Sequence, residues 1–195
     1  MKRRAPFFMP LVAVVLGVGV GALTSVFQAY LDFPWLALVN AVSPWVTTAF
    51  VAGALQSRLR TAVWTGLLAT LVQVVAYYAV AELRGYDASV YYLAFWSVCA
   101  LVGGPLFGAA GHAWRHASPA GLGAAALSAV YLSEALVTYQ IRLGYTSTAV
   151  LFGALGLALA VVLGRHRQQY GAMVRWLGPA LVAGSAGAAV LTLWA

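Results

Sequence analysis

Long apolar segments recur along the chain and alternate with short polar connectors. A helix needs about 20 apolar residues to cross the hydrocarbon core of a bilayer. Windows of roughly this length cover residues 7–30, 33–55, 61–83, 90–112, 119–140, 146–164 and 176–194. The pattern predicts an all-α, polytopic integral membrane bundle of about seven transmembrane helices, with residues 1–195 forming a single domain.

The composition supports a membrane setting. Of the 195 residues, 63% are hydrophobic and 8% are charged, whereas about a quarter of the residues in a soluble domain are charged. Lipid is therefore the expected solvent for most side chains. The first apolar window is too long for a signal peptide and lacks a cleavage site, so we expect it to be a retained span.

Few residues suit metal or disulfide chemistry. A single cysteine, Cys99, excludes an internal disulfide. The three histidines, His112, His116 and His166, lie beside arginines at expected helix ends, which is not a metal-ligand pattern. We therefore predict no metal and no cofactor.

Basic residues are distributed unevenly between the two sets of connectors. Of the 11 Lys and Arg residues, nine lie at the N-terminus or after the second, fourth and sixth windows: Lys2, Arg3, Arg4, Arg58, Arg60, Arg115, Arg165, Arg167 and Arg175. Only Arg84 and Arg142 lie in the other set. By the positive-inside rule, this predicts a cytoplasmic N-terminus and an outside C-terminus in a bacterial cytoplasmic membrane. The positive charge then reflects orientation, and no nucleic acid partner is expected.

Small residues and prolines mark expected features of helix packing. Gly17 and Gly21, Gly104 and Gly108, and the stripe Ala180, Gly184 and Ala188 repeat every four residues, which allows helix backbones to approach closely in lipid. Pro44 and Pro105 fall inside apolar windows, and we expect each to kink its helix and free a backbone carbonyl.

All four acids fall in the half of the bundle predicted to face outward. Asp32, Glu82 and Asp87 lie at helix ends or in a loop, but Glu134 lies about 9 Å inside the end of its helix at 1.5 Å per residue. An ionisable group at such depth is a functional hypothesis by default. The structural alternative is a Glu134 carboxyl bonded to a tyrosine, Asn40 or Gln28, or paired with Arg142 or Arg84.

Polar and aromatic side chains recur at helical spacing in the same outer half. Polar groups facing lipid are costly, so these stripes should turn inward and meet. An aromatic belt at the interface is the simpler interpretation of some aromatics, but it does not explain the polar stripes. We therefore predict an aromatic-walled cavity that opens outward, with these candidate binding residues: Tyr131, Tyr78, Tyr77, Tyr92, Trp96, Phe95, Trp45, Asn40 and Gln28.

The predicted cavity suggests acid chemistry. A carboxyl group in a low-dielectric pocket resists ionisation and can act as a general acid. Aromatic faces attract cations, and exclusion of water protects carbocations. The candidate catalytic residues are Glu134, Glu82 and Asp32.

This layout resembles the small seven-span transmembrane terpene cyclases of meroterpenoid and indole-terpenoid pathways. The resemblance covers the whole chain as architecture: the span count, the acids Glu134, Glu82 and Asp32, and the aromatic wall. No local motif matches residue by residue. The resemblance implies proton-initiated, metal-independent cyclisation of a lipophilic prenylated substrate within membrane lipid. The chain has no DDxxD-type acidic pair, which agrees with metal-independent chemistry.

Two other classes fit the sequence. The membrane-embedded binding subunits of vitamin transporters are also small and apolar, with an outward-facing site, but this chain differs in its expected seventh span and outside C-terminus. A structural or scaffolding membrane protein would leave the outer acids solvated. A channel is less favoured, because no window carries the repeated polar residues of a conducting path.

Overall fold

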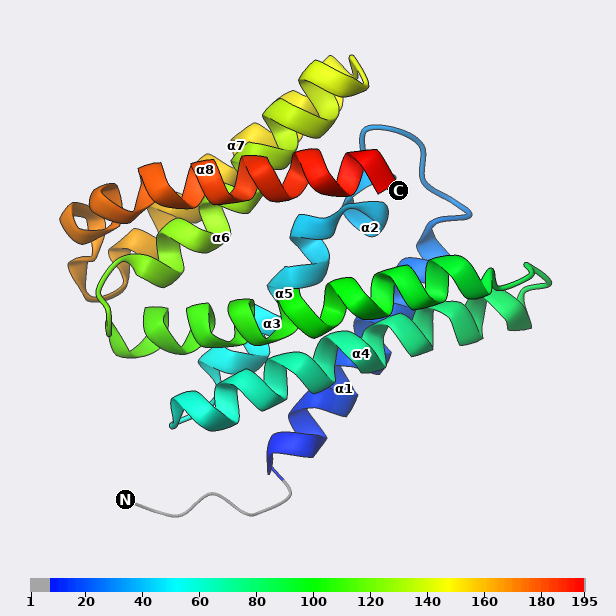
Figure 1. Cartoon of the computed structure of the whole chain (residues 1–195), viewed down its shortest axis with the longest axis horizontal. Coiled ribbons are helices and arrows are strands. Elements are labelled where there is room, and N and C mark those ends of the chain that lie inside the picture. The colour runs from blue at the N-terminus through cyan, green and yellow to red at the C-terminus, as the bar shows by residue number, and fades with distance from the viewer. Residues whose placement is uncertain (1–7, 195) are drawn as a thin grey trace. The chain divides into compact units, whose positions relative to one another are not determined.

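The computed structural model describes residues 8–194, so the predicted inner charges Lys2, Arg3 and Arg4 lie outside the described residues. Every regular element in this range is helical (Figure 1). The helices are α1 Phe8–Phe27, α2 Ala37–Asn40, α3 Val42–Ala54, α4 Leu59–Leu83, α5 Val90–His116, α6 Leu122–Ser133, the π-helix η1 Glu134–Arg142, α7 Thr146–Arg165, the 3-10 helix η2 His166–Gln168 and α8 Tyr170–Trp194.

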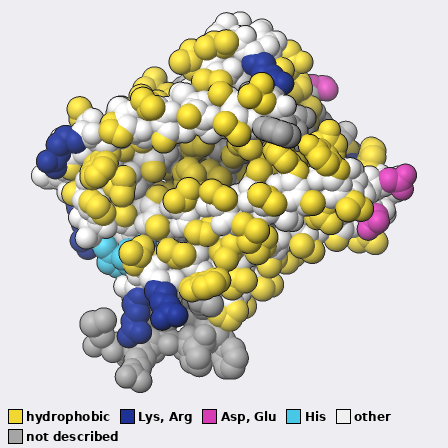
Figure 2. Space-filling model, in the orientation of Figure 1, with side chains coloured by type: hydrophobic (Ala, Val, Ile, Leu, Met, Phe, Trp, Pro, Cys, Tyr) yellow, Lys and Arg dark blue, Asp and Glu magenta, His cyan; other side chains and the backbone are white. Residues whose placement is uncertain are grey.

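Six helices are long and apolar enough to cross a membrane. They are α1, α4, α5, α6 continued by η1, α7 continued by η2, and α8. Hydrophobic side chains cover the sides of the helices, as Figure 2 shows. The all-helical prediction is confirmed, and the molecule is a multi-pass helical membrane protein.

The structure differs from the prediction at the second window, where residues 33–55 do not form one helix. Ala41, with φ −85° and ψ 157°, separates α2 from α3. Pro44 explains the break, because it has no N–H to donate to the carbonyl of Asn40 and its ring crowds that carbonyl. The resulting α3 has 13 residues and spans about 20 Å at 1.5 Å per residue. The break also leaves the first backbone amides of α3 without intrahelical acceptors.

The chain divides into two compact units. Unit 1 contains the described part of Met1–Leu31 together with Pro44–His112, and unit 2 contains Asp32–Ser43 and the described part of Ala113–Ala195. The first two residues of α3 therefore belong to unit 2, and the remainder belongs to unit 1.

In unit 1, α1 and α4 pack in parallel. A Cβ added to Gly17 would meet Ala69 and Val72, and one added to Gly21 would lie 2.3 Å from the carbonyl oxygen of Gln73. Contacts therefore advance along both helices in the same direction. The predicted role of the Gly17 and Gly21 pair in close helix packing is confirmed.

The contact between α4 and α5 in unit 1 is antiparallel and equally close. A Cβ on Gly66 would lie 2.4 Å from the carbonyl oxygen of Gly104, and a Cβ on Gly108 would lie 2.5 Å from the carbonyl oxygen of Ala62. The hydroxyl of Thr70 lies 3.4 Å from the carbonyl oxygen of Ala100. The predicted pair Gly104 and Gly108 thus packs inside the chain.

In unit 2, α6 is the central helix and is flanked by α7 and α8. Gly156 of α7 packs against Leu132 and the carbonyl of Ser128, and Gly184 of α8 packs against the side chain of Ser133. The Ser133 hydroxyl also lies 3.3 Å from the carbonyl oxygen of Leu181. Gly184, from the predicted small-residue stripe, is therefore a helix contact.

We expect Gly21→Ala to destabilise the protein and Gly19→Ala to leave its stability nearly unchanged. The new methyl at Gly21 would overlap the Gln73 carbonyl, whereas nothing lies within 4 Å of a Cβ at Gly19. Overpacking of this kind costs about 1–3 kcal/mol. Thermal unfolding of the purified protein in detergent measures the difference, and equal melting temperatures for the two variants would contradict the parallel α1–α4 contact.

Candidate functional site

A cavity of about 270 Å³ lies in unit 1, where the C-terminal ends of α1 and α4 meet the loop that follows α4. Its walls combine aromatic rings, an amide, a hydroxyl and two opposite charges. The lining residues are Ser25, Gln28, Ala29, Tyr77, Tyr78, Ala81, Arg84, Tyr86, Asp87 and Ala88.

Helix geometry and a glycine turn bring these residues together. Tyr77, Ala81 and Arg84 recur at helical spacing on one face of α4. Gly85 has φ +84°, a conformation that glycine adopts without steric cost. The amide of Gly85 bonds to the carbonyl of Glu82, and the amide of Tyr86 bonds to that of Ala81. This pair of bonds is a Schellman motif, and it turns the chain so that Tyr86 and Asp87 return to the cavity.

Two side-chain hydrogen bonds tie α4 to α1 at the cavity. The Tyr77 hydroxyl donates to the side-chain oxygen of Gln28, and the Arg84 guanidinium donates to the backbone carbonyl of Ser25. The Arg84 guanidinium also lies 5.2 Å from the centre of the Tyr86 ring. Ser25 is in the last turn of α1, whose carbonyls lack intrahelical donors and favour a nearby cation.

Two buried polar side chains at this helix contact have no hydrogen-bond partner among the residues that the structure describes. Ser25 lines the cavity, yet it is only 1% exposed. Gln73 lies one turn before Tyr77 on α4 and is 0% exposed. Neither the Ser25 hydroxyl nor the side-chain nitrogen and oxygen of Gln73 are hydrogen-bonded within the described part of the chain. Since buried polar groups nearly always have a partner, these groups indicate a site for an additional molecule.

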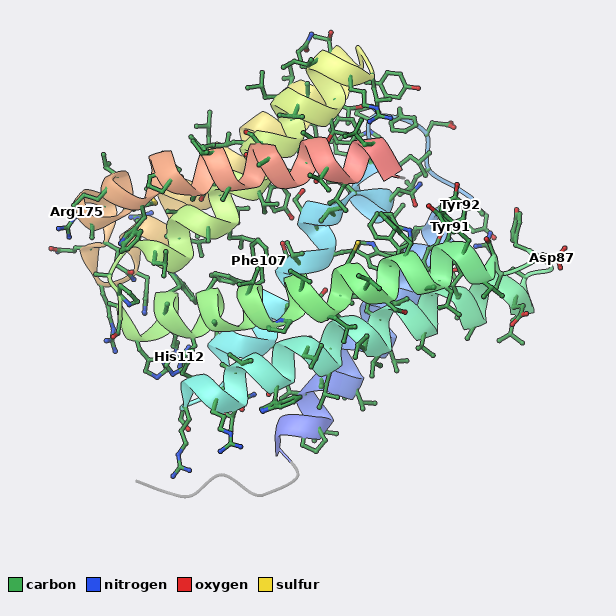
Figure 3. The ribbon with its side chains drawn as sticks, viewed as in Figure 1. Asp87, Tyr91, Tyr92, Phe107, His112 and Arg175 are labelled. Atoms are coloured by element: carbon green, nitrogen blue, oxygen red, sulfur yellow. The ribbon has the colours of Figure 1, made fainter. Side chains whose placement is uncertain are left out.

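The structure separates the predicted binding residues of unit 1 into two groups. Gln28, Tyr77 and Tyr78 line the cavity, and Trp45 packs edge-on against Tyr77 with ring centres 5.4 Å apart. The second group is an aromatic cluster near the start of α5, where Figure 3 shows Tyr91 and Tyr92. It contains Tyr91, Tyr92, Phe95 and Trp96, with neighbouring ring centres 5.0–6.4 Å apart.

Ser25, Arg84 and Tyr86 line the cavity although we did not predict them as binding residues. A signal for Ser25 was available, because it precedes Gln28 by three residues and shares its face of the helix. Arg84 gave a weaker signal as one of two basic residues in the outer connectors. For Tyr86 the available signal was Gly85, since glycine is common just past the end of a helix, but no local pattern showed that the turn would bring Tyr86 to the cavity.

In unit 2, the buried Glu134 caps the start of α3. Glu134 is 7% exposed. One carboxylate oxygen accepts the Val42 amide at 3.1 Å, and the other accepts the Ser43 amide at 2.9 Å and the Ser43 hydroxyl at 2.6 Å. These amides are the ones released by the break before α3. Pro44 has no N–H for the carbonyl of Asn40, as expected, but the groups that Glu134 satisfies are the amides released by the same break.

This geometry favours a structural role for Glu134. Three donors point at its two oxygens, so the group is arranged as a hydrogen-bond acceptor at a helix N-terminus, where negative charge is favourable. A general acid would instead direct a proton towards a substrate. The partners are Val42 and Ser43 rather than those considered in the structural alternative.

The remaining predicted site residues lie outside the cavity. Tyr131 is buried in unit 2, where its ring centre lies 5.8 Å from that of Phe152. Asp32 and Asn40 in unit 2 and Glu82 in unit 1 are exposed. The acid that lines the cavity is Asp87, which extends from the loop between α4 and α5 (Figure 3).

Fold and site together describe a multi-pass helical membrane protein with a polar, aromatic-walled cavity. The chain belongs to a family of unknown function, DUF6518, whose model matches residues 1–193. No curated protein and no solved structure matches the chain. Within residues 8–194, no group of three or more His, Cys, Asp or Glu side chains is placed to hold a metal ion.

We expect Glu134→Gln to lower thermal stability, whereas Glu82→Gln, on an exposed residue at the end of α4, should not. The amide of glutamine retains one acceptor oxygen but turns an N–H₂ group towards a donor. Leaving a buried donor unsatisfied costs about 1–3 kcal/mol. Unfolding monitored by circular dichroism tests this, and a Glu134→Gln protein as stable as the parent would show that the cap is dispensable.

Proposed function

We propose that the protein is a membrane-embedded binding protein that takes a small polar molecule into the cavity between α1 and α4, in a bacterial cytoplasmic membrane. The observation that carries this proposal is the buried hydroxyl of Ser25, a residue of the cavity wall, which has no hydrogen-bond partner within residues 8–194. A ligand with a hydrogen-bonding group would satisfy it.

The cavity wall indicates the chemistry of the ligand. Tyr77, Tyr78 and Tyr86 offer ring faces and edges to a flat ring. Arg84 has five N–H donors, and its guanidinium suits a carboxylate or another planar acceptor. The volume of about 270 Å³ is near the lower end of known ligand pockets. A small, flat molecule with an acidic or strongly accepting group fits these features.

The course of α1 and α4 supports the predicted number of crossings. Because α1 and α4 run in parallel, the chain between them must return across the bilayer. The segment 28–58 contains α2, the break and α3, so this segment supplies the return and supports the predicted seven crossings. With a cytoplasmic N-terminus, the C-terminal ends of α1 and α4, and hence the cavity, are placed towards the outer face.

Binding has more support than cyclisation. A proton-initiated cyclase needs a carboxyl group that delivers a proton inside an aromatic pocket, but Glu134 is occupied as a helix cap and does not line the cavity. Terpene cyclisation therefore stays a prediction from architectural resemblance. The binding proposal agrees with the class of transporter binding subunits considered from the sequence.

We expect Ala81→Leu to abolish binding, and Ala79→Leu to preserve it. Ala81 lines the cavity, so a larger side chain fills space that the ligand needs. Ala79 lies two residues away on α4 but borders a separate, wholly apolar groove, which makes the substitution a matched control. Mass spectrometry of small molecules released by denaturing the purified proteins measures occupancy.

Three results would overturn this proposal. The first is the absence of any released small molecule from the parent protein after purification in mild detergent. The second is equal occupancy in the Ala81→Leu and Ala79→Leu proteins. The third is conversion of a linear prenylated compound by membranes containing the protein, with loss of turnover in a folded Glu134→Gln variant, which would favour the cyclase instead.

A further inference from the structure

A group of basic side chains gathers in unit 2, where α5 ends and the linker between α7 and α8 begins. We call these residues the basic platform: Arg115, His116, Arg165, His166 and Arg167. The side chains of Arg115, Arg165 and Arg167 are exposed. Arg175, in the second turn of α8, lies near the N-terminal end of that helix (Figure 3).

Direct contacts join the two segments of the platform. A ring nitrogen of His166 lies 3.1 Å from the carbonyl oxygen of Arg115, and the Arg167 guanidinium donates to the carbonyl of His116 at 3.1 Å. The Trp114 ring lies 4.8 Å from the His166 ring, and its indole N–H donates to the carbonyl of Leu163 at 3.0 Å. A tryptophan with a bonded N–H at the base of basic loops is typical of the membrane interface.

The platform is held in an unfavourable backbone conformation. Arg167 has φ +53° and Gln168 has φ +51°, and across the contact Ala117 has φ +51°. Such left-handed conformations are costly for residues other than glycine, and they persist where surrounding contacts impose them. An imposed conformation at exposed basic residues suggests a function.

The surrounding contacts come mainly from Gln169, which is 2% exposed. Its side-chain oxygen accepts the Gly121 amide at 2.8 Å. Its side-chain nitrogen donates to the carbonyls of Trp114 at 3.0 Å and His166 at 2.9 Å. One buried amide therefore fixes both loops, so the charges are presented in set positions.

No acid of unit 2 neutralises the platform. The acids among its residues are Asp32 and Glu134, and Glu134 is bonded to Val42 and Ser43. Asp32 precedes Phe33, whose ring centre lies 5.0 Å from the ring centre of Tyr145. Tyr145 directly precedes α7, and Arg165 is the last residue of that helix. The 20 residues of α7 place its two ends about 30 Å apart, so Asp32 lies at the opposite end of α7 from Arg165.

We infer that the basic platform binds the phosphate of an anionic phospholipid headgroup through Arg115 and Arg167. Guanidinium groups suit phosphate oxygens, and basic residues at this membrane face attract anionic lipids. Trp114, whose ring packs against that of His166, suits the same interface. This inference is independent of the ligand proposed for the cavity between α1 and α4.

Native mass spectrometry of the full chain in detergent, titrated with phosphatidylglycerol or phosphatidylcholine, tests the inference. We expect the parent protein to favour phosphatidylglycerol by roughly tenfold or more, since each arginine near an anionic headgroup contributes about a fivefold gain. The double variant Arg115→Gln/Arg167→Gln should lose most of this preference. The control Arg58→Gln/Arg60→Gln removes two exposed charges at the start of α4 in unit 1 and should keep it.

Four outcomes would overturn the inference. The first is equal binding of the two lipids by the parent protein, and the second is an equal loss of the phosphatidylglycerol preference in the Arg58→Gln/Arg60→Gln control. The third is displacement of phosphatidylglycerol by millimolar glycerol phosphate, which would identify a site for free phosphate. The fourth is a folded double variant with an unchanged preference. If Arg167→Gln prevents folding, the double variant Arg115→Gln/Arg165→Gln replaces it. This variant should fold, because His166 contacts the backbone carbonyl of Arg115 and not its side chain. That variant should also lose the preference, and an unchanged preference would reject the site.

Discussion

The capping of a broken helix by Glu134 is the interaction on which the path of the chain depends. Pro44 prevents a continuous helix, so the amides of Val42 and Ser43 would face a low-dielectric interior without acceptors, at a cost of several kcal/mol each in lipid. The Glu134 carboxylate accepts both amides and the Ser43 hydroxyl. Burying the Glu134 side chain alone would be unfavourable, and so would burying the two amides alone. Their hydrogen bonds to each other offset both costs.

The same reasoning identifies where the protein has room for another molecule. At the start of α3, the released amides of Val42 and Ser43 both have an acceptor. Between α1 and α4, glycines bring the backbones together, and yet the Ser25 hydroxyl and the Gln73 amide have no partner within residues 8–194. Ser25 lines the cavity, so its hydroxyl, which has no partner among the described residues, favours binding of another molecule there.

The sequence predicted features that depend on local periodicity. Apolar windows located the long helices, the glycine spacing located their contacts, and helical stripes brought Gln28, Tyr77 and Tyr78 to one cavity. The sequence did not predict the partner of Glu134, because Ser43 lies 91 residues away and a backbone amide has no sequence signal. Tyr131 shows the same limit, because in the sequence a buried tyrosine that packs on Phe152 has the same spacing as one that lines a pocket.

The separation between Glu134 and its partners constrains the order of biogenesis. Val42 and Ser43 are synthesised more than ninety residues before the carboxylate that accepts their amides. During insertion, the start of α3 must therefore keep its amides in contact with water, the translocon or headgroups until α6 enters the bilayer. The start of α3 consequently reaches its final environment late, and a ribosome stalled before residue 134 would carry a chain whose broken helix still lacks its cap.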